Sequence, residues 1–316
     1  MNNLSFTLTD EIKEKLKEID SLRTKILLTP IKPKDEHKLR WEADINKTSW
    51  GLSLADNKLT KLQITKLLTK PLPKRLSNEE KEVIIYINTL RSIKEVWTAS
   101  KLPLNTNTIL NIYDLSCKAV FGPTASYFAS KEDSVSKILG FIESGRDNPV
   151  IKAGLIQIEI IKLSPFENAT GRVARLLSHL MLAKYGYDLR GLLVLEDYYR
   201  SDLVSLKEAT NSIEKDKNAT KWLLYFTEGV KKGMEKVLKN IETAGLNLAV
   251  SPLWKITTRQ NKILEYLENP ENKVTNRAVQ KMFNISQITA SRDLSKMVNL
   301  GLLLSHGKGR SVYYTK

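Results

Sequence analysis

Two arginines three residues apart, Arg172 and Arg175, begin a helical pattern directly after a short polar loop. The first amides of a helix have no partner within the helix, and the helix dipole favours negative charge there. Guanidinium groups bind phosphate oxygens through paired, charge-assisted hydrogen bonds. Gly171 has no side chain to block a phosphate, and the two arginines are expected to project from one side of the helix. The segment therefore predicts a phosphate site, although arginines near a helix start also serve as surface charges or salt-bridge partners.

The loop and the helix start resemble the motif of the Fic family, which reads HPFx(D/E)GNGRxxR. The matching positions are Pro165, Phe166, Gly171, Arg172 and Arg175. The resemblance implies a mainly helical domain that transfers AMP from ATP to a protein hydroxyl. It also implies that the two arginines contact the β- and γ-phosphates of ATP.

Four motif positions differ, and two of them carry the chemistry of the family. Ser164 stands at the position of the histidine base, and a serine hydroxyl cannot usefully accept a proton near neutral pH. General-base catalysis is typically worth roughly 10²–10⁴-fold, and this contribution is expected to be missing. Asn168 stands at the position of the acid that holds Mg²⁺, and a neutral amide oxygen binds that ion weakly. Ala169 and Thr170 replace a glycine and an asparagine, and Thr170 stays in the expected nucleotide-binding loop.

One alternative keeps an acidic group in the loop. Glu167 lies one position before the usual acid and would substitute for it through a shift in register. The histidines do not offer a replacement base, because His37, His179 and His306 all lie outside the motif and are expected to be structural or solvent-facing. ATP or another nucleotide is thus the expected ligand, without tightly bound Mg²⁺.

Two further segments also lack features of active Fic proteins. The run Leu54 to Thr60 resembles a segment that carries an inhibitory glutamate in many Fic proteins, but Ala55 occupies the glutamate position. The stretch from Gly122 to Asp133 is too short for the β-hairpin flap that registers a target segment. The resemblance covers roughly residues 40–245 and includes the apolar run from Trp222 to Phe226.

Apolar residues at helical spacing predict the elements that position the loop. Helices are expected at 78–97, 107–120, 133–143, 149–162, 171–184, 201–211 and 219–243. The segment 149–162 is apolar on nearly every side, which is typical of a helix at the centre of a helical domain.

Residues 256–316 resemble a winged helix-turn-helix domain. Helices are expected at 257–267, after Thr275 and after Ser286, followed by strands at 302–304 and 311–314. In such domains the third helix enters the major groove of DNA. The expected DNA-binding residues are Gln287, Thr289, Ser291, Arg292 and Lys296 on that helix and Lys308 and Arg310 at the wing tip. The alternative is a winged helix used for protein contact or dimerisation.

Charge and composition limit the possible partners and location of the protein. The chain of 316 residues has a formal net charge of +15. Eleven Lys or Arg residues and four Asp or Glu residues give the segment from 251 to 316 a net charge of +7, which favours nucleic acid as a partner. Cys117 is the single cysteine, so no internal disulfide or cysteine-cluster metal site is expected. No apolar run approaches the roughly 18 residues of a membrane span, so a cytoplasmic location is expected.

The sequence thus predicts a mainly α protein, with a Fic-type helical domain, an N-terminal helical extension and a small α/β winged-helix domain. The expected boundaries are 1–98 for the extension, 99–246 for the Fic-like domain, 247–255 for a linker and 256–316 for the winged helix. The leading hypothesis is a DNA-binding regulator whose Fic-like domain is catalytically impaired and serves for scaffolding, homodimerisation or nucleotide sensing. The alternative is an active adenylyltransferase, or another nucleotidyl or phosphoryl transferase, with a non-standard site.

Overall fold

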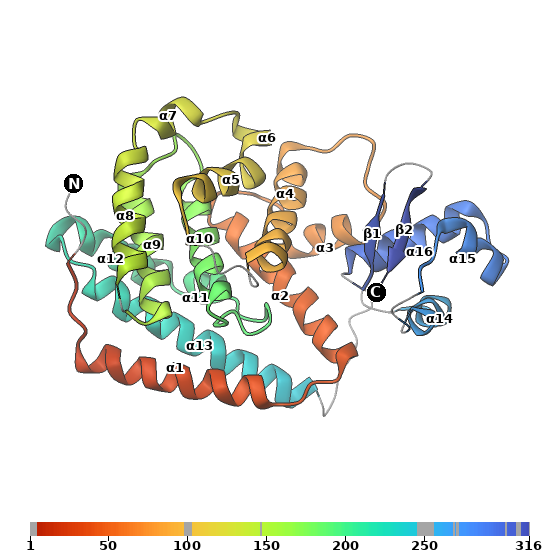
Figure 1. Ribbon diagram of the computed structural model, residues 1–316, viewed down its shortest axis with the longest axis horizontal. Helices are drawn as coiled ribbons and strands as arrows, with labels where there is room; N and C mark the ends of the chain where they lie inside the picture. The colour runs from red at the N-terminus through yellow and green to blue at the C-terminus, as the bar shows by residue number, and fades with distance from the viewer. Residues whose placement is uncertain are drawn as a thin grey trace.

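A helical body and a small C-terminal unit make up the computed structural model (Figure 1). The structure describes residues 5–97, 103–145, 147–244, 256–267, 269, 272–300, 302–307 and 311–315. The expected mainly α fold is confirmed, since a single two-stranded sheet accompanies the helices of the described residues. The expected linker 247–255 lies outside the described residues, and so do Lys308 and Arg310.

Two adjacent helices, α9 (Pro149–Leu163) and α10 (Thr170–Lys184), form the centre of the body. Asn148 caps α9 through its side chain, and Pro149 occupies the first helical position, where its missing N–H costs nothing. Nearly every side chain of α9 is buried, as its apolar sequence predicts. The loop of interest joins these two helices, so its ends are fixed by the best-packed part of the molecule.

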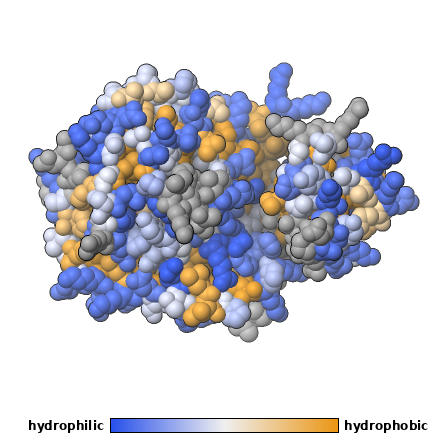
Figure 2. Space-filling model, in the orientation of Figure 1, coloured by the Kyte–Doolittle hydropathy of each residue, from blue (hydrophilic) through white to orange (hydrophobic). Residues whose placement is uncertain are grey.

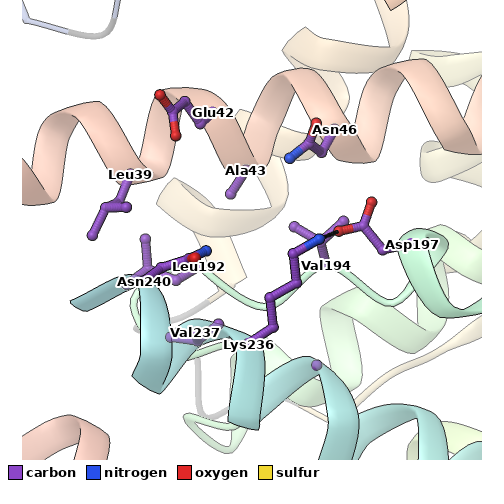
Figure 3. Close-up of a pocket in the computed structure, with 11 residues that line it drawn as sticks. Leu39, Glu42, Ala43, Asn46, Leu192, Val194, Asp197, Lys236, Val237 and Asn240 are labelled. Atoms are coloured by element: carbon purple, nitrogen blue, oxygen red, sulfur yellow. Dashed lines mark hydrogen bonds and ion pairs between the residues drawn. The ribbon is translucent and has the colours of Figure 1, made fainter. Parts of the chain in front are cut away.

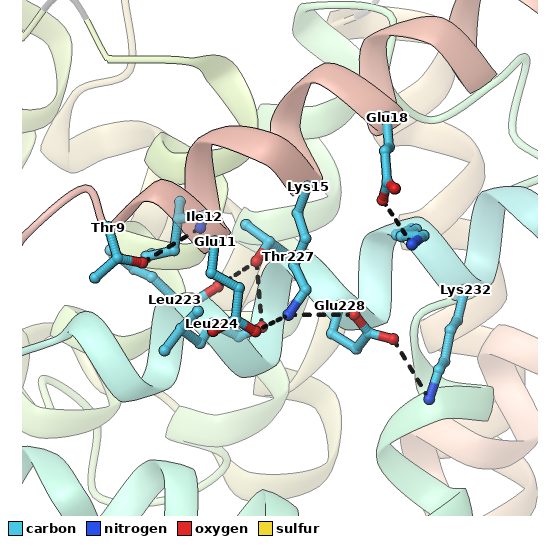
Figure 4. A network of polar contacts seen from close by, with 11 residues as sticks. Thr9, Glu11, Ile12, Lys15, Glu18, Leu223, Leu224, Thr227, Glu228 and Lys232 are labelled. Atoms are coloured by element: carbon cyan, nitrogen blue, oxygen red, sulfur yellow. Dashed lines mark hydrogen bonds and ion pairs between the residues drawn. The ribbon is translucent and has the colours of Figure 1, made fainter.

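The helices α1 (Asp10–Leu28) and α13 (Thr220–Ala244) pack side by side along one edge of the body. Ile12, Ile19 and Ile26 of α1 recur every seven residues and are buried. Ion pairs line the seam, where Lys15 bonds to Glu11 and Glu228 (Figure 4). Buried apolar area supplies most of the attraction, because partly exposed ion pairs contribute little.

Helices α2 (Pro33–Ser53), α3 (Lys61–Thr69) and α4 (Asn78–Ser92) cover the side of the body that faces the C-terminal unit. Thr60 with Gln63 and Ser77 with Glu80 form capping boxes that begin α3 and α4. The helix expected at 78–97 is observed, but its last turn is the π-helical segment η1 (Ile93–Trp97).

Four short helices lie before α9, and they correct one expectation. They are α5 (Thr106–Ser116), α6 (Lys118–Phe121), α7 (Ala125–Ala129) and α8 (Glu132–Ser144). The helix expected at 107–120 breaks at Cys117, whose backbone leaves helical geometry while its thiol is buried. The stretch 122–133 contains α7, so a helical turn stands where Fic proteins are expected to have a flap.

After α10, the helix expected at 201–211 is observed as α12 (Leu203–Asp216), which begins two residues later and follows a separate short helix, α11 (Glu196–Ser201). Asp202 separates the two helices: its backbone is not helical, and its Oδ1 accepts a hydrogen bond from the Ser205 amide at 2.9 Å. A capping carboxylate at this position competes with continuation of the helix, because its side chain replaces the backbone partner.

The C-terminal unit consists of α14 (Thr258–Tyr266), α15 (Asn276–Phe283), α16 (Gln287–Asn299) and the antiparallel strands β1 (Leu304–His306) and β2 (Tyr313–Thr315). Thr275 and Ser286 cap α15 and α16 as expected. Both strands begin two residues later than expected. The reason is local for β1, because the Leu302 amide bonds to the Met297 carbonyl at the end of α16 and Leu302 and Leu303 fill the core.

Candidate functional site

The loop between α9 and α10 is held by one aromatic side chain. Phe166 is 1% exposed and stacks on Tyr113 and Phe128, with ring centroids 4.7 and 5.5 Å away. Ser164 ends α9 with φ of 47°, and Ala169 precedes α10 with φ of 62°. Both residues therefore have left-handed backbone conformations, which non-glycine residues adopt uncommonly. The loop has a defined conformation even though it lacks the glycine and asparagine of the Fic motif.

The side chains at the expected chemical positions point to solvent and have little support. Ser164, Glu167 and Asn168 are exposed. The Ser164 hydroxyl lies 3.4 Å from the Thr170 hydroxyl, and Thr170 donates to the Phe166 carbonyl at 3.1 Å. These contacts shape the loop, and neither a hydroxyl nor a backbone carbonyl serves as a general base near neutral pH.

Arg172 is buried and paired inside the body. Its side chain is 1% exposed, and its Nη2 lies 3.0 Å from Oε1 of Glu82 on α4. The other oxygen of Glu82 accepts a hydrogen bond from the Asn57 amide at 2.6 Å. The guanidinium also lies over the Phe121 ring, 5.3 Å from its centroid. Arg172 therefore serves as a salt-bridge partner, which was the alternative to phosphate binding, and the salt bridge is buried.

Arg175 takes a different direction from Arg172. Its Nη2 donates to the Gly51 carbonyl of α2 at 2.9 Å, and the side chain is half-buried. The Tyr86 hydroxyl lies close by, and burial raises the pKa of this phenol strongly while Arg175 opposes the rise. The two arginines were expected to project together, but one points to α4 and the other to α2. Each guanidinium joins α10 to another helix, and their role in phosphate binding stays a prediction.

The surroundings of Gly171 leave room for a side chain, so the fold does not require glycine at this position. A Cβ at this position would meet only Nη1 of Arg175, at an ordinary contact distance of 3.5 Å. No side chain caps α10, and the Arg172 and Val173 amides both bond to the Ala169 carbonyl, at 2.9 and 3.1 Å. Phosphate binding at the start of this helix stays a prediction.

Magnesium and ATP fit this arrangement poorly. A phosphate on Arg172 would have to displace Glu82, and Asn168 offers only a neutral oxygen. Among the described residues, no group of three or more His, Cys, Asp or Glu side chains is placed to hold a metal ion. As arranged, the side chains tie helices together and do not form a cradle for Mg·ATP.

Glu82 and Asn57 are the residues that sequence reasoning missed. Glu82 shares a helical face with Tyr86 and Ile93. An acidic residue on this apolar face could have indicated a buried carboxylate that needs a cationic partner. Asn57 lies two residues after Ala55, in the segment expected to have lost an inhibitory glutamate. No sequence signal pairs Glu82 with Arg172, because the two residues lie 90 positions apart.

A second buried pair lies further along α10. His179 Nε2 is 2.6 Å from Glu196 Oε1, and Glu196 is fully buried. Burial alone would raise the pKa of Glu196, but the adjacent imidazole holds that pKa below its ordinary value. His179 is thus structural, as expected, and joins α10 to α11.

The exposed face of α16 carries most of the expected DNA-binding residues. Gln287, Ser291 and Arg292 are exposed. Thr289 is half-buried and shares a 2.9 Å hydrogen bond with the capping Ser286. Lys296 is half-buried and has an interaction partner. Three of the five residues expected to contact DNA are therefore exposed to solvent on α16.

A cavity between α2, α13 and the segment before α11 is too small for an organic ligand (Figure 3). Its volume is about 50 Å³. Lys236 crosses its edge and pairs with Asp197 at 2.5 Å. Since one water needs about 10–15 Å³ of such a cavity, the space accommodates a few water molecules.

Comparisons with known proteins agree with the two-part architecture. Residues 259–315 match the family described as DeoR-like helix-turn-helix domain. A comparison with curated proteins finds no match. None of the helices among the described residues is both long and apolar enough to cross a membrane.

Solved structures similar to the chain are Fic proteins. A Fic family protein from Desulfovibrio desulfuricans G20 has a TM-score of 0.63 and 15% identity, over 99% of this chain and 98% of that chain. A Fic domain containing signaling protein from Bacteroides thetaiotaomicron VPI-5482 has a TM-score of 0.57 and 20% identity, over 76% of this chain and 100% of that one. Part of Fic-1 from C. elegans has a TM-score of 0.57 and 14% identity, over 72% of this chain and 71% of that one. The helical body therefore has the Fic fold, and the C-terminal unit is a helix-turn-helix domain.

Proposed function

We propose that this protein is a DNA-binding regulator in which a Fic-fold body has lost AMP transfer and serves as a scaffold. The observation that carries the proposal is the helix-turn-helix domain with a polar, exposed face on α16. The net charge of +7 between residues 251 and 316 supports DNA as the partner, because phosphate contacts supply most non-specific affinity.

The chemistry of α16 supports contact with both phosphates and bases. Arg292 is exposed and suits either a phosphate or the two acceptors of guanine. Gln287 and Ser291 lie on the same helical face, one turn apart, and provide neutral hydrogen-bonding groups. Asp293 does not oppose DNA, since it is buried and paired with Arg259 at 2.5 Å.

A mobility-shift titration tests DNA binding. The full chain is expected to bind duplex DNA at low salt, and Arg292→Ala should weaken binding by roughly tenfold. If Arg292 contacts a phosphate, the slope of log affinity against log salt should also fall by about 1. Lys262→Ala, an exposed change on α14, is the control and should bind like the unaltered chain. Absence of any shift at low salt would overturn the proposal.

The loss of AMP transfer is supported by the loop and by Arg172. Ser164 and Asn168 supply neither a base nor a metal carboxylate. Glu167, the alternative acid, is exposed, and Arg172 already pairs with Glu82. An active transferase would need both the missing chemistry and a free arginine.

Labelled ATP with Mg²⁺ tests this second part of the proposal. The unaltered chain is expected to label neither itself nor added protein. The double variant Ser164→His with Asn168→Asp should remain inactive, whereas addition of Glu82→Ala is expected to permit nucleotide binding if the triple variant folds. Circular dichroism checks the fold. Labelling by the unaltered chain, abolished by Glu167→Gln, would instead support the transferase alternative.

A further inference from the structure

A second cavity lies where the helical body meets the C-terminal unit. Its volume is about 400 Å³, which falls within the range of about 300–1,000 Å³ typical of ligand pockets. Residues of α3, of α4 and of the segment between them line one side, and Ser295 of α16 lines the other. Figure 2 shows hydrophobic residues reaching the surface near this junction.

The body side of the cavity is mostly aliphatic. Its apolar lining residues are Leu67, Leu68, Pro71, Leu72, Ile84 and Ile87. Leu72 is 50% exposed, so part of this aliphatic surface is open to water. An apolar ligand body would remove this surface from water, at roughly 25 cal/mol for each Å² covered.

The charged groups of the lining are both cationic. Lys70, at the end of α3, makes no ion pair within the part of the chain that the structure describes. Arg91 of α4 approaches Asp44 at 4.0 Å. None of the described residues that line the cavity is acidic. Cations beside an aliphatic surface suit a molecule with an anionic head and an apolar chain.

We propose that this cavity binds a medium-chain carboxylate and that occupancy lowers DNA affinity. The chain lies on the aliphatic surface, and the carboxylate pairs with Lys70 beside Arg91. The coupling to DNA rests on the proposed function, while binding of the carboxylate does not.

The coupling follows from the position of Ser295. This residue lies between Arg292 and Lys296, one turn after Ser291 on the same helix, and α16 contacts α3. A ligand held between α3, α4 and α16 stabilises the arrangement in which the second half of α16 faces the body. DNA needs the face of that helix, so ligand and DNA oppose each other, and each lowers the affinity of the other by the same factor.

Calorimetric titration of the full chain with sodium decanoate, below its micellar concentration, tests binding. One decanoate is expected to bind per chain, and decyltrimethylammonium, which has the same chain length and the opposite charge, is not. Lys70→Glu should raise the dissociation constant at least about tenfold. Lys66→Glu, an exposed change on the same helix outside the cavity, is the matched control. Equal weakening by both variants, or no decanoate binding at all, would overturn the site.

The coupling is tested by mobility shift with and without decanoate. Saturating decanoate is expected to weaken DNA binding severalfold. Asn88→Trp places a large side chain on an exposed wall position of the cavity and should remove both decanoate binding and its effect on DNA. Unchanged DNA affinity in saturating decanoate would overturn the coupling. If no DNA binds under any condition, the proposed function fails, and calorimetry still decides whether the cavity binds decanoate.

Discussion

Arg172 and Arg175 show that a residue can match a motif and still bind a different partner from the one that the motif implies. Both occupy positions that match a nucleotide-binding motif, and both guanidinium groups are used to join helices. For Arg172 the partner is a carboxylate in the interior, where an unpaired charge is costly. The same side chain thus supports the fold in place of a ligand.

Removal of the negative partner tests this structural role. Glu82→Gln keeps the shape of the side chain but leaves the Arg172 charge buried, and breaking such a pair typically costs about 3–5 kcal/mol of unfolding free energy. The double change Glu82→Leu with Arg172→Met should recover most of that loss, because a buried ion pair is often replaceable by apolar side chains. Urea unfolding measures both.

Asp133→Asn provides the matched control for this prediction, because it removes a carboxylate that pairs with Lys137 on the surface. It should have a much smaller effect. A Glu82→Gln loss no greater than that of Asp133→Asn would contradict a structural role for the buried pair.

Glu196 predicts a pH dependence of stability. Its pKa in the folded protein lies below the ordinary value of 4.5 because of His179, despite burial. The ionised carboxylate therefore contributes stability that is fully present above pH 4.5 and is lost as the pH falls through the lower folded value. Urea unfolding between pH 7 and pH 3 should show a steeper loss for the unaltered chain than for Glu196→Gln. Parallel curves would mean that Glu196 has no part in acid unfolding.

At the scale of elements, local signals located most helices but not their interruptions. Thr275 and Ser286 were recognised as caps, because a capping side chain acts on amides within three residues. The break at Cys117 was missed, since apolar periodicity continues across it. The stretch 122–133, which the sequence shows to be too short for a flap, contains α7, and Phe128 of α7 packs against Phe166 of the loop. The packing of α7 on the loop is a tertiary contact, which apolar periodicity does not specify.

The contact between α2 and α4 makes an element-scale prediction. A Cβ on Gly51 would lie 2.6 Å from the Tyr86 hydroxyl, so Gly51→Ala should destabilise the body by roughly 1–3 kcal/mol. In a Tyr86→Phe background the same change should cost much less, because the clashing oxygen is gone and alanine favours a helix by about 0.5–1 kcal/mol. Thermal or urea unfolding of the four chains measures the coupling. Additive effects would show that the two residues do not interact.

At the scale of the whole molecule, the helical body and the C-terminal unit meet at α3, α4 and α16. The expected boundaries between domains remain predictions, and the segment that joins the units lies outside the described residues. The junction matters because it places the helix proposed to read DNA beside an aliphatic surface with two cations. Regulation of DNA binding from the helical body then needs only a ligand that fits this junction.

The sequence by itself determined the helical class, the position of the loop between two central helices and the helix-turn-helix pattern at the C-terminal end. These features follow from periodicity and capping, which act over a few residues. Only the tertiary structure decided that Arg172 pairs with Glu82, that Arg175 bonds to Gly51 and that a cavity forms beside Ser295. Each of these joins segments far apart in the chain, and no local pattern specifies which distant side chain will satisfy a buried charge.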